Sequence, residues 1–230
     1  MNQPNATIGA DMLPREAEML RDGFRRAPFK SRLIARHRNA ISPLAPLLAE
    51  LPPGGDCELL DVGCGSGLLL LCAAMRGRIS RGHGVDSNAR AIAEAEQAAG
   101  RIAAAATLPP LSFGVCANFD EWPDREFDAV SLVDVMHHVP PALQIALLDA
   151  AGRRVRAGGR IIYKDMCRRP RWRSLANRAH DLLLSRQWIH YLPLARVMEW
   201  GARNGYAVAR SETYSRLWYG HELLVLDKPK

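Results

Sequence analysis

The middle of the chain alternates between short apolar segments and longer segments with helical spacing. The apolar segments predict strands at Glu58–Val62, Gly82–Asp86, Leu111–Cys116, Phe127–Asp134 and Gly159–Asp165. The segments between them predict helices at Leu68–Met75, Ala89–Ala105 and Pro141–Arg156. Strands that alternate strictly with helices favour a parallel sheet covered by helices on both faces, so the predicted fold class is α/β.

The two ends of the chain depart from this alternation. Before the first strand, apolar residues at helical spacing predict helices, and Ser42 followed by proline is expected to cap the second of them. Pro-Pro-Gly-Gly at 52–55 stops this stretch, which predicts a helical N-terminal cap over residues 1–50 and a main domain over 51–230. After further predicted helices, the last two predicted strands are separated by a short turn and must pair antiparallel. These last elements are the helices Leu175–Leu184 and Pro193–Asn204 and the strands Tyr206–Tyr214 and His221–Asp227.

A glycine-rich turn follows the first predicted strand. Its pattern is D-x-G-x-G-x-G, beginning at Asp61 and placing glycines at 63, 65 and 67. Glycines permit a tight turn and let a ligand approach the main chain, while the next helix presents free N–H groups. The second strand ends at Asp86, where a carboxylate can accept hydrogen bonds from both hydroxyls of a ribose. The pattern therefore predicts a cofactor that contains a nucleoside.

Two common nucleotide motifs do not fit this turn. The NAD pattern G-x-G-x-x-G requires glycine at position 68, which is leucine. A P-loop requires Gly-Lys followed by Ser or Thr, and the sequence contains no such tripeptide. The alternative to a cofactor site is a purely structural turn in another kind of α/β protein.

Several stretches between residues 58 and 165 resemble the class I S-adenosylmethionine-dependent methyltransferases that act on small molecules. They are LLDVGCGSG at 59–67, GVDSN at 84–88, FDAV at 127–130, VMHHV at 135–139 and RAGGR at 156–160. The resemblance implies a Rossmann-like seven-stranded sheet in the order 3-2-1-4-5-7-6, with strand 7 antiparallel. It also implies S-adenosylmethionine as the cofactor and S-adenosylhomocysteine as a product.

The same resemblance implies a set of cofactor-binding residues. Asp86 would hold the ribose, Ser87 would lie beside the adenine, and Asp134 would lie near the methionine end. Asn118 occupies the place of the family's usual acid near the adenine amine, and its amide oxygen can still accept a hydrogen bond from that amine. The full set is Asp61, Gly63, Cys64, Gly65, Gly67, Asp86, Ser87, Asn118, Phe119 and Asp134.

Three residues are candidates for catalysis on the acceptor side, because a hydroxyl or phenol acceptor benefits from proton removal. They are His138 after the fourth strand, Asp165 at the end of the fifth, and His180 in a segment, 166–191, predicted as a substrate lid. Each has a structural alternative. His138 is also consistent with a helix start, Asp165 with an ordinary ion pair at a strand end, and His180 with a surface helix.

The composition narrows the class of protein. With 230 residues, 48% hydrophobic and 24% charged, the chain fits a single globular domain. Its five scattered cysteines form no C-x-x-C pair, which predicts neither disulfides nor a metal site and suits the cytoplasm. No apolar run approaches the length that a membrane span needs.

The net charge of +7 is unevenly distributed. Between Arg21 and Arg38 there are seven Lys or Arg residues and one acid, Asp22. Such a cluster can bind nucleic acid, acyl-phosphate groups or an anionic membrane face. A solvated arginine-rich surface is the simpler interpretation. A peripheral membrane contact is thus left open, and nucleic acid is not expected as a partner.

The predicted function is methyl transfer to a hydroxyl or ring carbon of an aromatic or polyketide-like metabolite in secondary metabolism. The chain is expected to act as a monomer or homodimer. One alternative is an RNA or protein methyltransferase that uses the basic clusters. An alternative of another class is a non-catalytic module that binds S-adenosylmethionine, because a fold alone does not determine a function.

Overall fold

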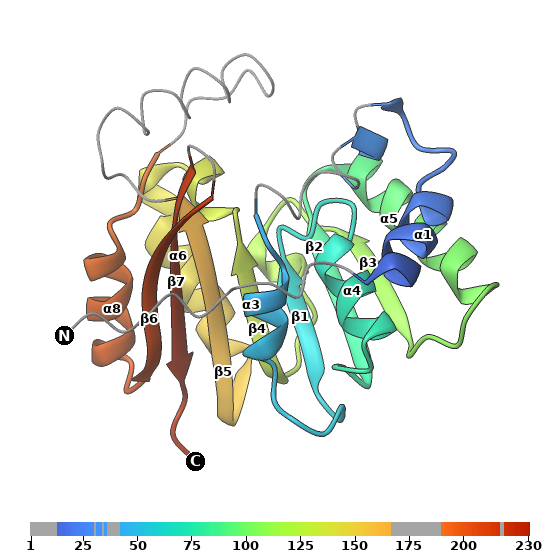
Figure 1. The fold of residues 1–230 in the computed structure, drawn as a ribbon. Coiled ribbons are helices and arrows are strands. Elements are labelled where there is room, and N and C mark those ends of the chain that lie inside the picture. Colours follow the sequence, from blue (N-terminus) through green and yellow to red (C-terminus); the bar gives the residue numbers. More distant parts are fainter. Residues whose placement is uncertain (1–12, 30, 34, 36–41, 167–189, 217–218) are drawn as a thin grey trace.

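The computed structural model describes residues 13–29, 31–33, 35, 42–166, 190–216 and 219–230 (Figure 1). The strands are β1 (Glu58–Val62), β2 (Arg81–Asp86), β3 (Leu111–Val115), β4 (Phe127–Val133), β5 (Val155–Met166), β6 (Ala207–Arg216) and β7 (Tyr219–Asp227). The α-helices are α1 (Pro14–Gly23), α3 (Ala45–Ala49), α4 (Leu68–Met75), α5 (Ala89–Ala103), α6 (Pro141–Arg153) and α8 (Leu194–Arg203). Two short 3-10 helices are η1 (Phe119–Glu121) and η2 (Met136–His138).

These strands form one sheet in the order β3-β2-β1-β4-β5-β7-β6. Strands β1 to β5 run parallel to one another, and β7 runs antiparallel to both β5 and β6. The predicted α/β class, the strand order and the antiparallel strand 7 are confirmed. In a sheet of this kind ligands bind outside the carboxyl ends of the parallel strands. The functional site is therefore expected at the ends of β1, β2, β4 and β5.

An apolar cluster covers each face of the sheet. Adjacent residues of β1 point to opposite faces, so Leu59 packs with residues of α1, α3, α4 and α5, and Leu60 with residues of α6 and α8. Both leucines are fully buried. Figure 1 shows α8 at one end of the sheet and α1 with α5 at the other. Burial on both faces fixes the strands, and the strands in turn fix the residues at their carboxyl ends.

The start of β5 differs from the sequence prediction. Helix α6 ends at Arg153, and β5 begins at Val155 instead of Gly159. Gly158 has a φ of +74°, and the pairing of β4 with β5 shifts register between Phe127 and Ala129. The two glycines at 158 and 159 therefore lie at an irregularity within a long strand, where the apolar pattern had favoured a longer helix.

The prediction that Ser42 caps a helix is wrong. Helix α3 begins at Ala45 with Leu44 in the capping position, and no side chain caps it. The Ser42 hydroxyl instead bonds with Asp134 and Lys164. Hydrogen bonds to charged groups are stronger than those to neutral amides, which accounts for this choice of partners.

Candidate active site

The glycine-rich turn after β1 is held against the end of β2 by hydrogen bonds. The N–H groups of Gly63 and Cys64 donate to the Val85 carbonyl oxygen at 2.8 and 3.1 Å. The Gly65 N–H donates to Oδ2 of Asp86 at 2.8 Å. The turn and the acid that was predicted to hold a ribose therefore form one structural unit.

Glycine is required at two positions of this turn for different reasons. Gly63 has a φ of +68° and Gly65 a φ of +54°, both in the left-handed region that favours glycine. A β-carbon on Gly63 would collide with the side chain of Val135, whereas one on Gly65 would meet no atom within 4 Å. Gly63 thus allows close packing against the segment after β4, and Gly65 leaves open space above the main chain.

A cavity of about 580 Å³ lies over the turn. This volume falls within the roughly 300–1,000 Å³ of small-molecule sites. Of the predicted cofactor residues, those that line it are Asp61, Gly63, Cys64, Gly65 and Asp134. The sequence did not signal the other contributions, which include Asn88, Arg90 and Glu94 at the start of α5 and Pro28, Ser31 and Leu44 from the N-terminal cap.

The remaining predicted cofactor residues do not line this cavity. Gly67 occupies the capping position of α4, and Ser87 is exposed. Asn118 is exposed and donates from Nδ2 to Oε1 of Glu121 at 3.0 Å. The Phe119 ring packs edge-on against Trp122, with centroids 5.4 Å apart. An adenine contact at residues 87, 118 and 119 therefore stays a prediction.

Carboxylates dominate the chemistry of the cavity wall. Asp61 is buried, and its Oδ1 accepts a hydrogen bond from the Ser131 hydroxyl at 2.6 Å. Burial raises the pKa of the Cys64 thiol far above its ordinary value, and the charges of Asp61 and Asp86 raise it further. Cys64 therefore stays a neutral thiol and is not a nucleophile. Such a wall favours a cationic ligand.

Lys164 and Asp134 form a buried ion pair at the edge of the cavity. Lys164 is fully buried, and its Nζ donates to Oδ1 of Asp134 at 2.6 Å and to the Ser42 hydroxyl at 2.7 Å. The Ser42 hydroxyl donates to Oδ2 of Asp134 at 3.0 Å. Asp134 has a φ of 56°, the only positive value at a non-glycine position within the described ranges. The network holds Asp134 in this conformation and ties the N-terminal cap to the cavity wall.

Asp165 lies two residues after Tyr163 on β5 and therefore faces the other side of the sheet from Lys164. It is buried, and its Oδ2 accepts from the backbone N–H of His137 at 3.0 Å, while Oδ1 bonds with Nδ1 of the same histidine. The rings of His137 and His138 are in contact, with centroids 4.1 Å apart. His137 is buried and His138 is exposed, so this series of side chains runs from the core to the surface.

The structure thus joins two of the predicted catalytic residues, Asp165 and His138, through His137. The third, His180, lies outside the described residues, as do positions 167–189 of the predicted lid. Sequence reasoning missed the partner of Lys164. A lysine within the apolar run of β5 was the available signal, because a buried ammonium needs a charged partner.

Fold and cavity together define an α/β protein with a cavity over the glycine-rich turn that follows β1. The sequence model of the methyltransferase-domain family matches residues 31–211. The chain therefore belongs to this family, and the resemblance to class I S-adenosylmethionine-dependent methyltransferases is confirmed, together with the cofactor that it implied.

Curated relatives include two ubiquinone biosynthesis O-methyltransferases. The protein of Alkalilimnicola ehrlichii is 29% identical over 161 residues, covering 67% of this chain and 62% of the relative. That of Pseudomonas putida is 28% identical over 114 residues, covering 50% of this chain and 46% of the relative. The chain therefore spans between about half and three-fifths of the length of the relatives that it matches.

Solved structures show the same fold. The magnesium protoporphyrin IX methyltransferase of Synechocystis with bound S-adenosylhomocysteine has a TM-score of 0.64 at 20% identity, covering 90% of this chain and 93% of its own. An O-methyltransferase family protein of Burkholderia thailandensis has a TM-score of 0.68 at 17% identity, covering 94% of this chain and 68% of its own. None of the described helices is long and apolar enough to cross a membrane. The described His, Cys, Asp and Glu side chains form no group of three that could hold a metal ion.

Proposed function

We propose that this chain transfers the methyl group of S-adenosylmethionine to a small-molecule acceptor. The acceptor atom is a hydroxyl oxygen or a ring carbon of an aromatic or polyketide-like metabolite. The observation that carries the proposal is the cavity over Gly65, which the carboxylates of Asp61 and Asp134 line and which Asp86 adjoins through its bond to Gly65.

The residues around the cavity fit this cofactor. Its cationic methionine end would lie by Asp61 and Asp134, and its ribose hydroxyls would donate to Asp86. The space above Gly65 admits a ligand close to the main chain. The cofactor supplies an electrophilic methyl group on a positively charged sulfur, and the chain supplies binding, orientation and a path for the acceptor's proton.

His138 is the residue that we assign to proton removal from a hydroxyl acceptor. It is exposed on η2, immediately beyond the carboxyl end of β4, and an imidazole titrates near neutral pH. Asp165 contacts His137 rather than the cavity, and His137 contacts His138. Asp165 and His137 are therefore positioning residues in this proposal.

The names of the compared proteins support this class of acceptor. The relatives are O-methyltransferases of ubiquinone biosynthesis, and one structural neighbour methylates magnesium protoporphyrin IX. These names point to small molecules and to oxygen as the acceptor atom.

The proposal is tested by calorimetry with S-adenosylhomocysteine and by methyl transfer from labelled S-adenosylmethionine to a panel of phenols. Asp86→Asn should weaken S-adenosylhomocysteine binding by about 1.5–3 kcal/mol, because charge-assisted hydrogen bonds are lost. Asp56→Asn, an exposed acid before β1, is the matched control and should leave the affinity unchanged. Absence of binding by the unmodified chain would overturn the cofactor assignment. Turnover of RNA or protein but of no phenol would overturn the acceptor class.

A further inference from the structure

Large apolar side chains are exposed together on the N-terminal cap. Leu13 is 58% exposed, Phe29 72% and Leu33 46%. Together they make up half of the large hydrophobic side chains that are exposed within the described part of the chain, the others being Val115, Leu143 and Val208. Phe29 and Leu33 line one hollow of this surface, and exposed apolar groups gathered in this way mark a binding surface.

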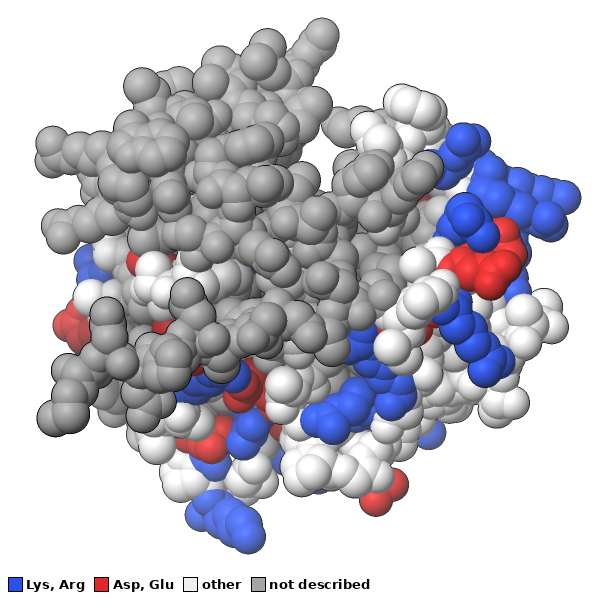
Figure 2. Space-filling model, in the orientation of Figure 1, with Lys and Arg blue, Asp and Glu red and all other residues white. Residues whose placement is uncertain are grey.

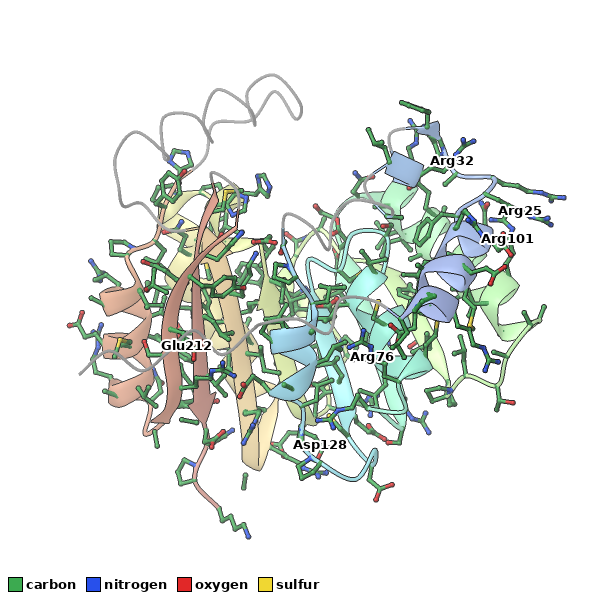
Figure 3. The ribbon with its side chains drawn as sticks, in the orientation of Figure 1. Arg25, Arg32, Arg76, Arg101, Asp128 and Glu212 are labelled. Atoms are coloured by element: carbon green, nitrogen blue, oxygen red, sulfur yellow. The ribbon has the colours of Figure 1, made fainter. Side chains whose placement is uncertain are left out.

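Arginines surround these apolar side chains. Arg25, Arg26 and Arg32 are exposed, and the sequence from Arg21 to Arg38 carries seven basic residues against one acid. Figure 2 shows Lys and Arg side chains gathered at the corner of the molecule that holds α1. Arg25 and Arg32 project from this corner in Figure 3. The surface formed by Arg25, Phe29, Arg32 and Leu33 is called the cap surface below.

The cap surface borders a hollow of about 690 Å³. Its lining combines apolar residues, among them Phe24, Phe29 and Leu33, with the basic residues Arg21, Arg25 and Arg32 and the acids Glu18 and Asp22. An apolar recess whose basic residues outnumber its acids matches an amphiphile that carries a negative head group.

The segment that forms the cap surface also reaches the cofactor cavity. Pro28 and Ser31 line the cavity, whereas the neighbouring residues Phe29 and Arg32 line the hollow. Whatever occupies the cap surface therefore lies beside the cofactor cavity.

We propose that the cap surface docks on an anionic lipid bilayer. The arginines would be attracted to the anionic head groups, and the side chains of Phe29 and Leu33 would insert into the membrane–water interface. Nucleic acid would bind the arginines alone, so it would give no role to the exposed Phe29 and Leu33. Docking needs no methyl transfer. If the proposed function also holds, docking places an acceptor dissolved in the bilayer beside the cofactor cavity.

The experiment is co-sedimentation of the full chain with vesicles of phosphatidylcholine, with and without phosphatidylglycerol. Binding is expected only to the anionic vesicles and should fall as salt rises. Arg25→Gln with Arg32→Gln should weaken it roughly tenfold or more, because each arginine near the membrane surface contributes about fivefold. Phe29→Ser with Leu33→Ser should weaken it by about tenfold as well.

Matched pairs elsewhere on the surface serve as controls. Leu143→Ser with Val208→Ser removes two other exposed apolar groups, and Arg196→Gln with Arg203→Gln removes two exposed arginines of α8. Both should bind like the unmodified chain. Unchanged thermal unfolding and S-adenosylhomocysteine binding show that each variant is folded. No binding to anionic vesicles, equal binding to both vesicles, or equal losses in the control pairs would overturn the proposal, whatever the outcome for methyl transfer.

Discussion

The site at the carboxyl ends of the strands has two halves that are built in different ways, and of their residues named below only Gly63, Cys64, Gly65 and Asp134 line the cavity. The donor half (Gly63–Gly65, Val85 and Asp86) is held by backbone N–H groups, with the Gly63 N–H 2.8 Å from the Val85 oxygen. The acceptor half (Ser42, Asp134, His137, His138, Lys164 and Asp165) is held by side chains from distant parts of the sequence. Ser42 and Lys164, for example, are 122 positions apart.

Because of this difference, different substitutions should disturb each half. The donor half depends on conformations that glycine permits, so it should be disturbed mainly by added β-carbons. The acceptor half depends on buried charges that compensate one another, so it should be disturbed most when one partner is removed. An added β-carbon therefore tests the donor half, and removal of one charged partner tests the acceptor half.

Removal of the Lys164 ammonium should have the largest effect on stability. Lys164→Met leaves the Asp134 carboxylate without its cation, and breaking such a buried pair costs about 3–5 kcal/mol. Urea denaturation measures the loss. Adding Asp134→Asn to this variant should recover part of the stability, because the two residues are coupled.

An exposed ion pair provides the control for Lys164. Arg196 pairs with Glu199 on α8 at 3.7 Å, and both side chains are well exposed. Arg196→Met should cost well below about 1 kcal/mol, since solvent screens such pairs. If Lys164→Met proved as mild as this control, the contrast between the two halves would fail.

The histidines test whether the acceptor half acts in catalysis. His138→Gln should lower kcat by roughly a hundredfold, at the lower end of what general bases contribute. The affinity for S-adenosylhomocysteine should not change, because His138 does not line the cofactor cavity. His83→Gln is the matched control, since His83 lies on β2 and bonds with Ser112 of β3. Turnover near that of the unmodified enzyme in His138→Gln would remove the assignment of the base.

The glycines test the donor half directly. Gly63→Ala should cost about 2 kcal/mol of stability, from left-handed strain and collision with Val135. Gly65→Ala should cost about 1 kcal/mol by strain alone, yet weaken S-adenosylhomocysteine binding because its methyl group enters the cavity. Urea denaturation and calorimetry separate the two effects.

Gly54→Ala is the control for this pair of glycines. Gly54 has a φ of +98°, and its added β-carbon would meet no atom within 4 Å, as at Gly65. It does not line the cavity, so its substitution should affect stability alone. An equal loss of affinity in Gly54→Ala and Gly65→Ala would show that strain, rather than the cavity, explains the result.

The donor half could be predicted from the sequence because its signal is local. The glycines at 63, 65 and 67 stand next to Asp61, and Asp86 follows at the end of the next strand. The alternation of strands and helices predicted the parallel part of the sheet in the same way. The full strand order came from the resemblance to a family, since apolar periodicity does not specify which strands are neighbours.

The acceptor half could be predicted only in part. Asp165 was conspicuous as a charge at the end of an apolar strand, and alternation along β5 puts it and Lys164 on opposite faces. Their partners were not predictable, because local rules carry no information on tertiary distance. Ser42 illustrates the limit. Local preference made it a helix cap, while the buried charges of Lys164 and Asp134 engage its hydroxyl in the folded chain.

The smallest effect is expected at a charge pair that joins the cap to the end of α4. Glu16 of α1 is buried and accepts hydrogen bonds from Arg76, after α4, at 2.7 and 2.8 Å, and from the Leu13 N–H at 2.9 Å. Arg76 is labelled in Figure 3. Burial acts to raise the pKa of Glu16, but these hydrogen bonds outweigh it and the pKa is lowered. The Glu16 carboxylate therefore stabilises the fold where it is ionised.

The pH dependence of this pair shows whether a charge holds α1 of the cap onto the end of α4, the helix that follows the donor half's glycine-rich turn. Because the pKa of Glu16 is lowered on folding, its contribution is complete above the ordinary value of about 4.3 and is lost as the pH falls through the folded value. Glu16→Gln should cost about 1 kcal/mol at neutral pH, and the cost should shrink as the pH drops below 4. Glu18→Gln, whose partner Arg21 is exposed and 3.8 Å away, should have no measurable effect. A cost of Glu16→Gln that did not vary with pH would mean that packing, not charge, fastens α1 to the end of α4.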